Sequence, residues 1–160
     1  MSESEKVFSD GRDLPNEHRV EFLVRDSECD QLQGVNNSHY MAYFEHARYQ
    51  YLREHLGVDV AKMTRDHKLA LVVANCNIDF HRALVANDRF YIKSKFERIG
   101  SRKFRFDQKI YYCDSQRSKP LASAVFLLIS IDLETGRAKE FGVIDELFSR
   151  SRGATGTVVP

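Results

Sequence analysis

Hydrophobic residues recur at spacings of three and four between His39 and Leu56, a stretch that contains neither Gly nor Pro. Apolar positions with this period lie on one side of an α-helix, so the pattern predicts an amphipathic helix of about five turns. Gly57 is expected to end the helix, and Asn37 or Ser38 to provide the N-cap oxygen at its start. The apolar positions are Tyr40, Met41, Tyr43, Phe44, Ala47, Tyr51 and Leu52.

Patterns typical of β-strands lie on both sides of this helix. Residues 19–25 form a short β-like run, and residues 26–38 after it are polar without an apolar period, as in a loop. After a second short helix expected at 60–67, the alternation predicts strands at 69–80, 90–97, 104–112 and 121–131. The last strand is almost continuously apolar, which predicts a central strand covered on both faces. A turn at 134–136 and a further short helix at 143–150 are expected after it.

This order of elements separates one long helix from the strands. It predicts an α+β fold in which an antiparallel sheet wraps around a single central helix. The chain of 160 residues is 42% hydrophobic, enough apolar surface for one domain, which we place at residues 18–150. Residues 1–17 and 151–160 are expected to be disordered tails, because they are largely small or polar.

Charge and cysteine content narrow the class of partner. Lys and Arg total 24 against 23 Asp and Glu, so there is no electrostatic reason to expect a nucleic acid. An apolar signal-peptide segment and a run long enough to span a bilayer are both missing, which predicts a soluble, cytoplasmic protein without a membrane partner. The three cysteines form no C-x-x-C pair, so zinc is not expected. Cys76 and Cys113 lie in apolar strand contexts and are predicted to be buried.

The loop before the long helix brings a carboxylate, Asp30, close to the helix start. Backbone N–H groups at a helix start are unpaired and the helix dipole is positive there, so this end can polarise a carbonyl and hold an oxyanion. A carboxylate beside an oxyanion site is a hydrolase arrangement. An Asp in such a loop more commonly serves as a turn or capping residue, and the residues alone leave that alternative open.

Six residues between Val24 and Arg48 follow a family order, namely Asp30, Gly34, Asn37, Tyr40, Glu45 and Arg48. This order resembles the active-site signature of hotdog-fold acyl-CoA thioesterases of the 4-hydroxybenzoyl-CoA thioesterase type. The run D-Q-L-Q-G-V-N-N-S-H-Y is particularly similar to the acyl-lipid thioesterases of plants and bacteria. Two departures are visible. The glycine lies four residues after the Asp where many members have three, which places Gln33 in the turn, and Asn37 stands where bacterial relatives often have His.

The resemblance implies a hotdog fold and hydrolysis of an acyl-CoA or acyl-carrier-protein thioester without a cofactor. In this reaction Asp30 would act as nucleophile or general base. Peptide N–H groups near His39 and Tyr40 would bind the thioester oxygen, and Asn37 would shape the loop or donate a hydrogen bond. Hotdog sites lie between subunits, so a homodimer or homotetramer is implied. The alternative is a non-catalytic acyl-binding or scaffold protein with the same fold.

Two helix positions have both a functional and a structural explanation. Glu45 is a candidate base, a role that some hotdog thioesterases assign to a helix glutamate. Pairing with Arg48 or another cation across the i, i+3 spacing is the commoner explanation. His39 and His46 share a helix face, but two histidines without a third ligand are weak evidence for a metal, and solvated or core histidines are the alternative.

The remaining candidates lie on the predicted sheet and at its turns. Asn75 and Asn77 alternate along one strand face and are candidates to line the pocket, with simple exposure as the alternative. Arg82, Arg102 and Lys103 lie near strand ends or turns, where cations can meet the phosphates of coenzyme A.

Overall fold

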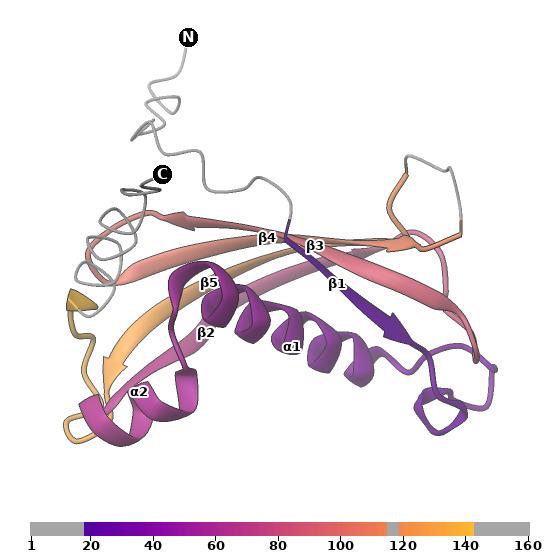
Figure 1. The fold of residues 1–160 in the computed structure, drawn as a ribbon. Helices are drawn as coiled ribbons and strands as arrows, with labels where there is room; N and C mark the ends of the chain where they lie inside the picture. Colours follow the sequence, from indigo (N-terminus) through magenta and orange to yellow (C-terminus); the bar gives the residue numbers. More distant parts are fainter. Residues whose placement is uncertain (1–17, 115–118, 143–160) are drawn as a thin grey trace, which may run out of the picture.

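The computed structural model describes residues 18–114 and 119–142, which form a five-stranded antiparallel sheet in the order β1-β3-β4-β5-β2. The sheet curves over one long helix, and a short second helix lies near one end (Figure 1). The predicted α+β arrangement is therefore confirmed. In chain order the elements are β1 (His18–Leu23), a 3₁₀ turn (Asp26–Glu28), α1 (Asn37–Leu56), α2 (Val60–His67), β2 (Leu69–Phe80), β3 (Arg89–Arg98), β4 (Lys103–Tyr112) and β5 (Ala122–Asp132).

The core lies between α1 and the concave face of the sheet. Side chains alternate along β3 and β4, so every second residue of each strand is buried against the helix. Phe44 of α1 meets Phe126 of β5 with ring centroids 5.5 Å apart. Tyr51 of α1 meets Phe106 of β4 at 5.5 Å. The apolar period of the helix and the alternation of the strands therefore converge on one aromatic core.

The ends of α1 show which polar residues cap it. Asn36 is the N-cap, because its Oδ1 accepts a hydrogen bond of 3.0 Å from the Ser38 backbone N–H. The expectation of Asn37 or Ser38 as the cap was wrong by one or two residues. Gly57 ends the helix in the left-handed region, at φ 63°, as predicted.

The two strands at one side of the sheet are less buried than the sequence suggested. β5 lies between β4 and β2 rather than at the centre, and only its inward residues are buried. The continuous apolar run is thus half covered in this chain. β2 is the edge strand on this side, and most of its residues are exposed. Cys76 is one of these, and Cys113 is half-buried, so the prediction that both thiols are buried was wrong.

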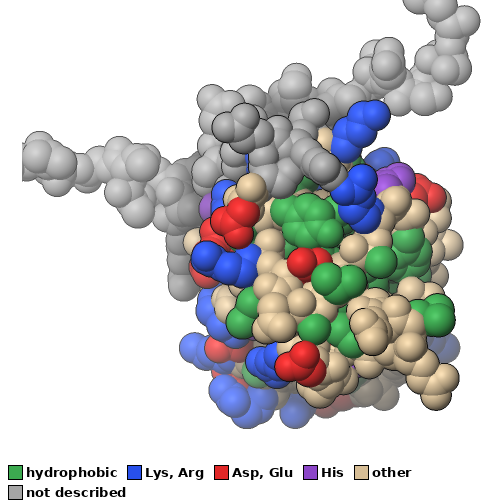
Figure 2. Space-filling model, turned by 90° about the vertical axis from the view of Figure 1, so that its right-hand side faces the viewer, with side chains coloured by type: hydrophobic (Ala, Val, Ile, Leu, Met, Phe, Trp, Pro, Cys, Tyr) green, Lys and Arg blue, Asp and Glu red, His purple; other side chains and the backbone are tan. Residues whose placement is uncertain are grey.

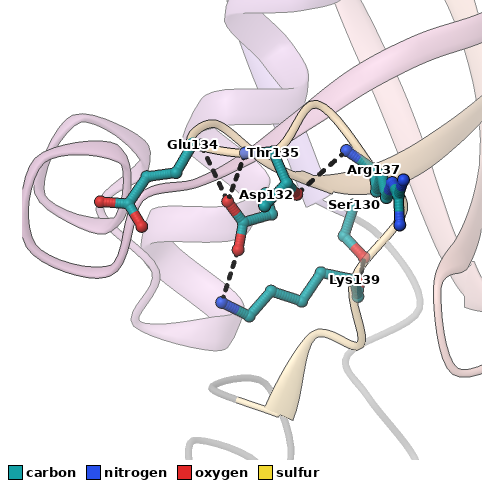
Figure 3. A network of polar contacts seen from close by, with 6 residues as sticks. All are labelled: Ser130, Asp132, Glu134, Thr135, Arg137 and Lys139. Carbon is teal, nitrogen blue, oxygen red and sulfur yellow. Dashed lines mark hydrogen bonds and ion pairs between the residues drawn. The ribbon is translucent and has the colours of Figure 1, made fainter.

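A polar turn closes the far end of β5, as the sequence predicted for 134–136. The Asp132 carboxylate accepts from the backbone N–H groups of Glu134 and Thr135 at 2.8 and 3.1 Å, and from Lys139 Nζ at 2.8 Å (Figure 3). These hydrogen bonds lower the pKa of Asp132 below its usual value. The chain then returns along the strand, where the Lys139 N–H donates to the Ser130 carbonyl at 3.0 Å. Gly136 adopts φ 68°, which a glycine reaches without strain.

Three expectations fall on residues that the structure does not describe. The proposed helix at 143–150 lies outside the described residues, as do the tails 1–17 and 151–160.

None of the helices within the described part of the chain has both the length and the apolar character needed to cross a bilayer.

Candidate active site

The loop that carries Asp30 is a small hairpin. The Asn36 N–H donates to the Glu28 carbonyl at 2.9 Å, Cys29 pairs with Val35, and the Asp30 N–H donates to the Gly34 carbonyl at 2.8 Å. Asp30 thus lies directly before the three-residue turn 31–33. The returning strand of this hairpin leads straight into α1.

The Asp30 side chain is exposed and stabilises its own turn. Its Oδ1 accepts from the Leu32 N–H at 2.8 Å, and its backbone carbonyl accepts from the Gln33 N–H at 2.9 Å. The turn role that the sequence left open is therefore confirmed. Within the described residues no donor reaches Oδ2, so one carboxylate oxygen is free to act on a substrate.

Gln33 takes the backbone conformation that a glycine would adopt most easily. Its φ is 61°, in the left-handed region, which costs a residue with a Cβ about 1–2 kcal/mol. The neighbouring Gly34 has no such φ, and a Cβ built there would meet Ala83 Cβ and the Leu84 carbonyl oxygen at an ordinary 3.8 Å. The departure from the family spacing noted at Gln33 therefore coincides with the strained position of the turn.

We expect Gln33→Gly to raise the free energy of unfolding by up to about 1 kcal/mol, because it removes the left-handed strain. Urea unfolding of both proteins measures this difference. Gly34→Ala is the matched control, and its stability should stay within about 0.5 kcal/mol of wild type. A loss of stability in Gln33→Gly would show that the glutamine side chain holds the turn.

The first free amide at the start of α1 belongs to Asn37. The Ser38 N–H is occupied by the Asn36 side chain, and the His39 N–H donates to the Asn36 carbonyl at 2.9 Å. Within the described residues the Asn37 N–H has no acceptor. The His39 amide expected to bind the thioester oxygen is therefore occupied, and the Asn37 amide becomes a candidate oxyanion donor at the helix start.

Hydrogen bonds tie the hairpin to α1 and to the loop before β3. The Val35 N–H donates to the Leu84 carbonyl at 2.8 Å, and the Tyr40 hydroxyl accepts from the Leu84 N–H at 3.1 Å. Burial raises the pKa of Tyr40 above its ordinary value. A second tyrosine, Tyr43, donates its hydroxyl proton to the Glu28 carboxylate. The candidate site is thus held at both strands of the hairpin.

Apolar side chains surround the hairpin at this end of the molecule. Figure 2 faces this end, and hydrophobic side chains gather near the middle of the view. Leu32 at the tip of the turn is 90% exposed. The exposed large hydrophobic residues at this end are Leu23, Leu32, Met41, Phe80 and Val85. The surface around the Asp30 turn is therefore partly apolar.

Arg48 of α1 and Gln108 of β4 form a buried polar network between the helix and the sheet. Arg48 is 3% exposed, and its Nη1 donates to Gln108 Oε1 at 3.1 Å while the guanidinium stacks 4.0 Å from the Phe126 ring centroid. Gln108 is fully buried and donates to the Phe44 carbonyl at 3.1 Å and to Ser94 Oγ at 2.9 Å. Burial lowers the pKa of Arg48 to about 10, so its side chain remains cationic at neutral pH.

Glu45 lies on the exposed side of α1, and its Oε1 accepts from the Tyr49 hydroxyl at 3.1 Å. Among the described residues it makes no direct ion pair with Arg48, because the Arg48 guanidinium turns into the core and donates to Gln108, although the Glu45 charge still acts on it electrostatically. Glu45 is eight residues into α1, about 12 Å along the helix axis from Asn37. This separation makes it a weaker candidate base than Asp30.

The histidines of α1 are placed apart from any ligand cluster. His39 is half-buried near the helix start, and His46 packs edge-on against Phe22 with ring centroids 5.7 Å apart. In the described part of the chain, no group of three or more His, Cys, Asp or Glu side chains is placed to hold a metal ion. The arrangement favours the packing explanation for His46.

The two strand candidates, Asn75 and Asn77, lie on the outer face of β2. Ile78 and Phe80 of β2 face the core, and Phe80 meets Tyr40 at 4.9 Å, so Asn75 and Asn77, which alternate with them along the strand, point to the opposite face. In this chain the two asparagines therefore do not face the helix start. A bulge between residues 73 and 75 sets this register.

The predicted CoA-binding cations also lie apart. Arg82 follows β2 at the same end as Asp30, where its N–H donates to the Leu121 carbonyl at 3.0 Å. Arg102 and Lys103 lie at the β3–β4 hairpin, at the opposite end of the sheet. Of these three predicted cations, Arg82 lies at the same end of the sheet as Asp30.

Sequence reasoning missed Glu28 and Gln108. Glu28 is 15 residues from its partner Tyr43, and Gln108 is 60 residues from Arg48, so neither pair follows a local spacing. One available signal was a glutamine among the alternating apolar residues of β4, on the same face as Phe106 and Ile110.

Comparison with known proteins identifies the family. A family model described as the thioesterase-like superfamily matches residues 24–146, which include the hairpin, α1 and all of β2 to β5. The chain belongs to this family.

Named relatives of this thioesterase-like chain come from plants and bacteria. It is 29% identical over 122 residues to acyl-acyl carrier protein thioesterase ATL3 of Arabidopsis thaliana, an alignment that covers 76% of this chain and 62% of ATL3. It is 28% identical over 120 residues to the long-chain acyl-CoA thioesterase FadM of Escherichia coli, covering 75% and 87%. The chain thus spans about three fifths of the plant relative's length.

Solved structures confirm the hotdog fold for this thioesterase-like chain. The probable thioesterase YbaW of Escherichia coli is 27% identical with a TM-score of 0.67, and the match covers 82% of this chain and 96% of that one. A 1,4-dihydroxy-2-naphthoyl-CoA thioesterase from Synechocystis has a TM-score of 0.74 at 15% identity, covering 89% and 99%. The second likeness concerns the fold alone.

Proposed function

We propose that this chain hydrolyses an acyl thioester, carried by CoA or by an acyl carrier protein, to a free acid and a thiol. The observation that carries the proposal is one hairpin that presents a free Asp30 oxygen and leads into an unpaired Asn37 amide. These are the two groups that acyl transfer requires, a nucleophile or base and an oxyanion donor.

The proposed reaction needs only water in addition to the substrate. Asp30 either attacks the thioester carbonyl carbon or removes a proton from the water that attacks it. The carbonyl oxygen becomes an oxyanion, which accepts a hydrogen bond from the Asn37 N–H. Its collapse breaks the C–S bond and releases the thiolate, which takes up a proton. If Asp30 attacks directly, water then hydrolyses the acyl-Asp30 anhydride and restores the carboxylate.

The relatives support both kinds of carrier, since one is named for acyl carrier protein and another for long-chain acyl-CoA. The exposed apolar residues around the hairpin suit an acyl group, and Arg82 at the same end suits a phosphate. A thiol-trapping dye assay over a series of acyl-CoA and acyl-carrier-protein esters tests the proposal. We expect thiol release from at least one series. Binding of these esters without any release would instead favour a non-catalytic acyl-binding protein.

We propose further that the protein forms a homodimer through β2, or a homotetramer made of two such dimers. Among the described strands this edge strand pairs on one side only, and its Val72 and Val73 are 37% and 41% exposed. Long apolar edge strands are normally covered, because their free N–H and C=O groups pair with other chains. Sedimentation velocity should show a dimer or tetramer that Val73→Lys converts to monomer. Ile99→Lys, at an exposed site away from β2, is the matched control, and a wild-type monomer would contradict this assembly.

A further inference from the structure

The Glu28 side chain connects the strand that carries Asp30 to the interior of α1. Its Oε2 accepts from the Tyr43 hydroxyl and, at 2.9 Å, from the Arg25 backbone N–H. Its backbone carbonyl accepts from the Asn36 N–H at 2.9 Å. Glu28, two residues before Asp30, therefore connects the 3₁₀ turn, the N-cap of α1 and the second turn of α1.

Tyr43 is a rigid anchor for this contact. It is 6% exposed, and its ring packs against Phe90 at 4.9 Å and Phe22 at 5.4 Å between centroids. Aromatic contacts on β1 and β3 thus fix the ring, so its hydroxyl has little freedom to move. A hydrogen bond to this hydroxyl fixes Glu28 relative to the sheet as well as to the helix.

The proton of this hydrogen bond stays on the tyrosine. Burial raises the pKa of Glu28, but hydrogen bonds from the Arg25 amide and the Tyr43 hydroxyl outweigh it, so the pKa is lower than usual. Burial and the bond to Glu28 both raise the pKa of Tyr43. The acceptor is therefore an ionised carboxylate, and hydrogen bonds of this kind are roughly twice as strong as neutral ones.

We propose that Glu28 and Tyr43 are positioning residues, which hold Asp30 and the Asn37 amide in register for thioester hydrolysis. This inference rests on the proposed function. Both groups of the reaction adjoin residues that Glu28 fastens. Asp30 lies two residues after Glu28 on the hairpin, and Asn37, the first residue of α1, follows its backbone partner Asn36. The Glu28 Oε2 already accepts two hydrogen bonds, which suits a support rather than a base.

Steady-state kinetics with the thiol-trapping assay tests the pair. Tyr43→Phe removes only the hydroxyl, and we expect kcat to fall about 10- to 100-fold, the scale set by small misplacements of reacting groups. KM should stay within about twofold, since the contacts of the acyl group are unchanged. Tyr51→Phe is the matched control, because Tyr51 is also buried on α1 but its hydroxyl faces the Phe96 backbone, two turns further along. Its kcat should equal that of wild type.

The conservative variant separates support from chemistry. Glu28→Gln keeps an oxygen acceptor for Tyr43 and Arg25, so we expect it to retain most of kcat, whereas Glu28→Ala should resemble Tyr43→Phe. A Glu28→Gln variant as inactive as one without the Asp30 carboxylate would show that Glu28 acts in the reaction itself. That result would overturn the positioning role.

Hydrogen exchange of the hairpin provides a readout that does not depend on activity. The amides of Asp30 and Asn36 are hydrogen-bonded across the hairpin and should exchange faster in Tyr43→Phe than in wild type or Tyr51→Phe. Unchanged exchange in Tyr43→Phe, or an equal loss of kcat in Tyr51→Phe, would overturn the inference. If wild type released no thiol, the proposed function would fail, while the exchange rates would still report whether the pair holds the hairpin.

Discussion

Asp30→Asn should lower kcat by about 10²- to 10⁴-fold, the contribution typical of a positioned acid or base group. An amide can neither accept the proton of water at this position nor attack the carbonyl as a carboxylate does. The turn should survive, because the amide oxygen of Asn still accepts from the Leu32 N–H as Oδ1 does at 2.8 Å. Steady-state rates and thermal unfolding of the same preparations separate loss of chemistry from loss of structure.

Asp26→Asn is the matched control for this experiment. Asp26 is also exposed in the segment before α1, but it lies in the 3₁₀ turn and uses its backbone carbonyl to accept from the Cys29 N–H at 3.2 Å. Its kcat should match wild type, which excludes a general effect of removing negative charge near the site. A fully active Asp30→Asn would leave Asp30 with the turn role alone.

Gln108→Leu should lower the free energy of unfolding by roughly 3 kcal/mol or more. It removes the acceptor of Arg48 and the donor to Ser94 and the Phe44 carbonyl, and each orphaned buried group costs about 1–3 kcal/mol, more if charged. Arg48 remains cationic because its lowered pKa is still about 10. Chemical unfolding at neutral pH measures the loss.

The double variant Arg48→Met with Gln108→Leu tests whether the loss arises from the stranded charge. Replacing buried polar partners together by apolar groups of similar size is often nearly neutral. We therefore expect the double variant to be more stable than Gln108→Leu alone. A double variant that is less stable would show that shape, rather than the unpaired guanidinium, determines the cost.

The regular elements followed from the sequence because their patterns are local. The helix and strands matched their periodicities closely, and α2 and β2 have the predicted bounds. The N-cap of α1 could not be predicted from the pattern, because Asn36, Asn37 and Ser38 are adjacent and all can cap a helix. This small ambiguity changed which amide is free, and with it the identity of the candidate oxyanion donor.

The site was predictable in part, and the remainder depends on contacts between distant segments. Asp30 and the helix start were found from the loop and its resemblance. The burial of Arg48 was not predicted, because a charged side chain three residues from Glu45 ordinarily pairs with it at the surface. The face of Asn75 and Asn77 depends on a bulge that alternation does not reveal, since one extra residue reverses all that follow.

The place of β1 in the sheet has a consequence for how the protein folds during synthesis. β1 precedes the Asp30 hairpin in sequence, yet it pairs with β3, Leu23 opposite Arg89 and His18 opposite Ser94. The hairpin also depends on Leu84, which lies just before β3. An emerging chain therefore cannot assemble Asp30 and the start of α1 until β3 has left the ribosome. Such long-range pairings slow folding and leave strands exposed in the meantime, so the candidate site forms well after its own residues have been synthesised.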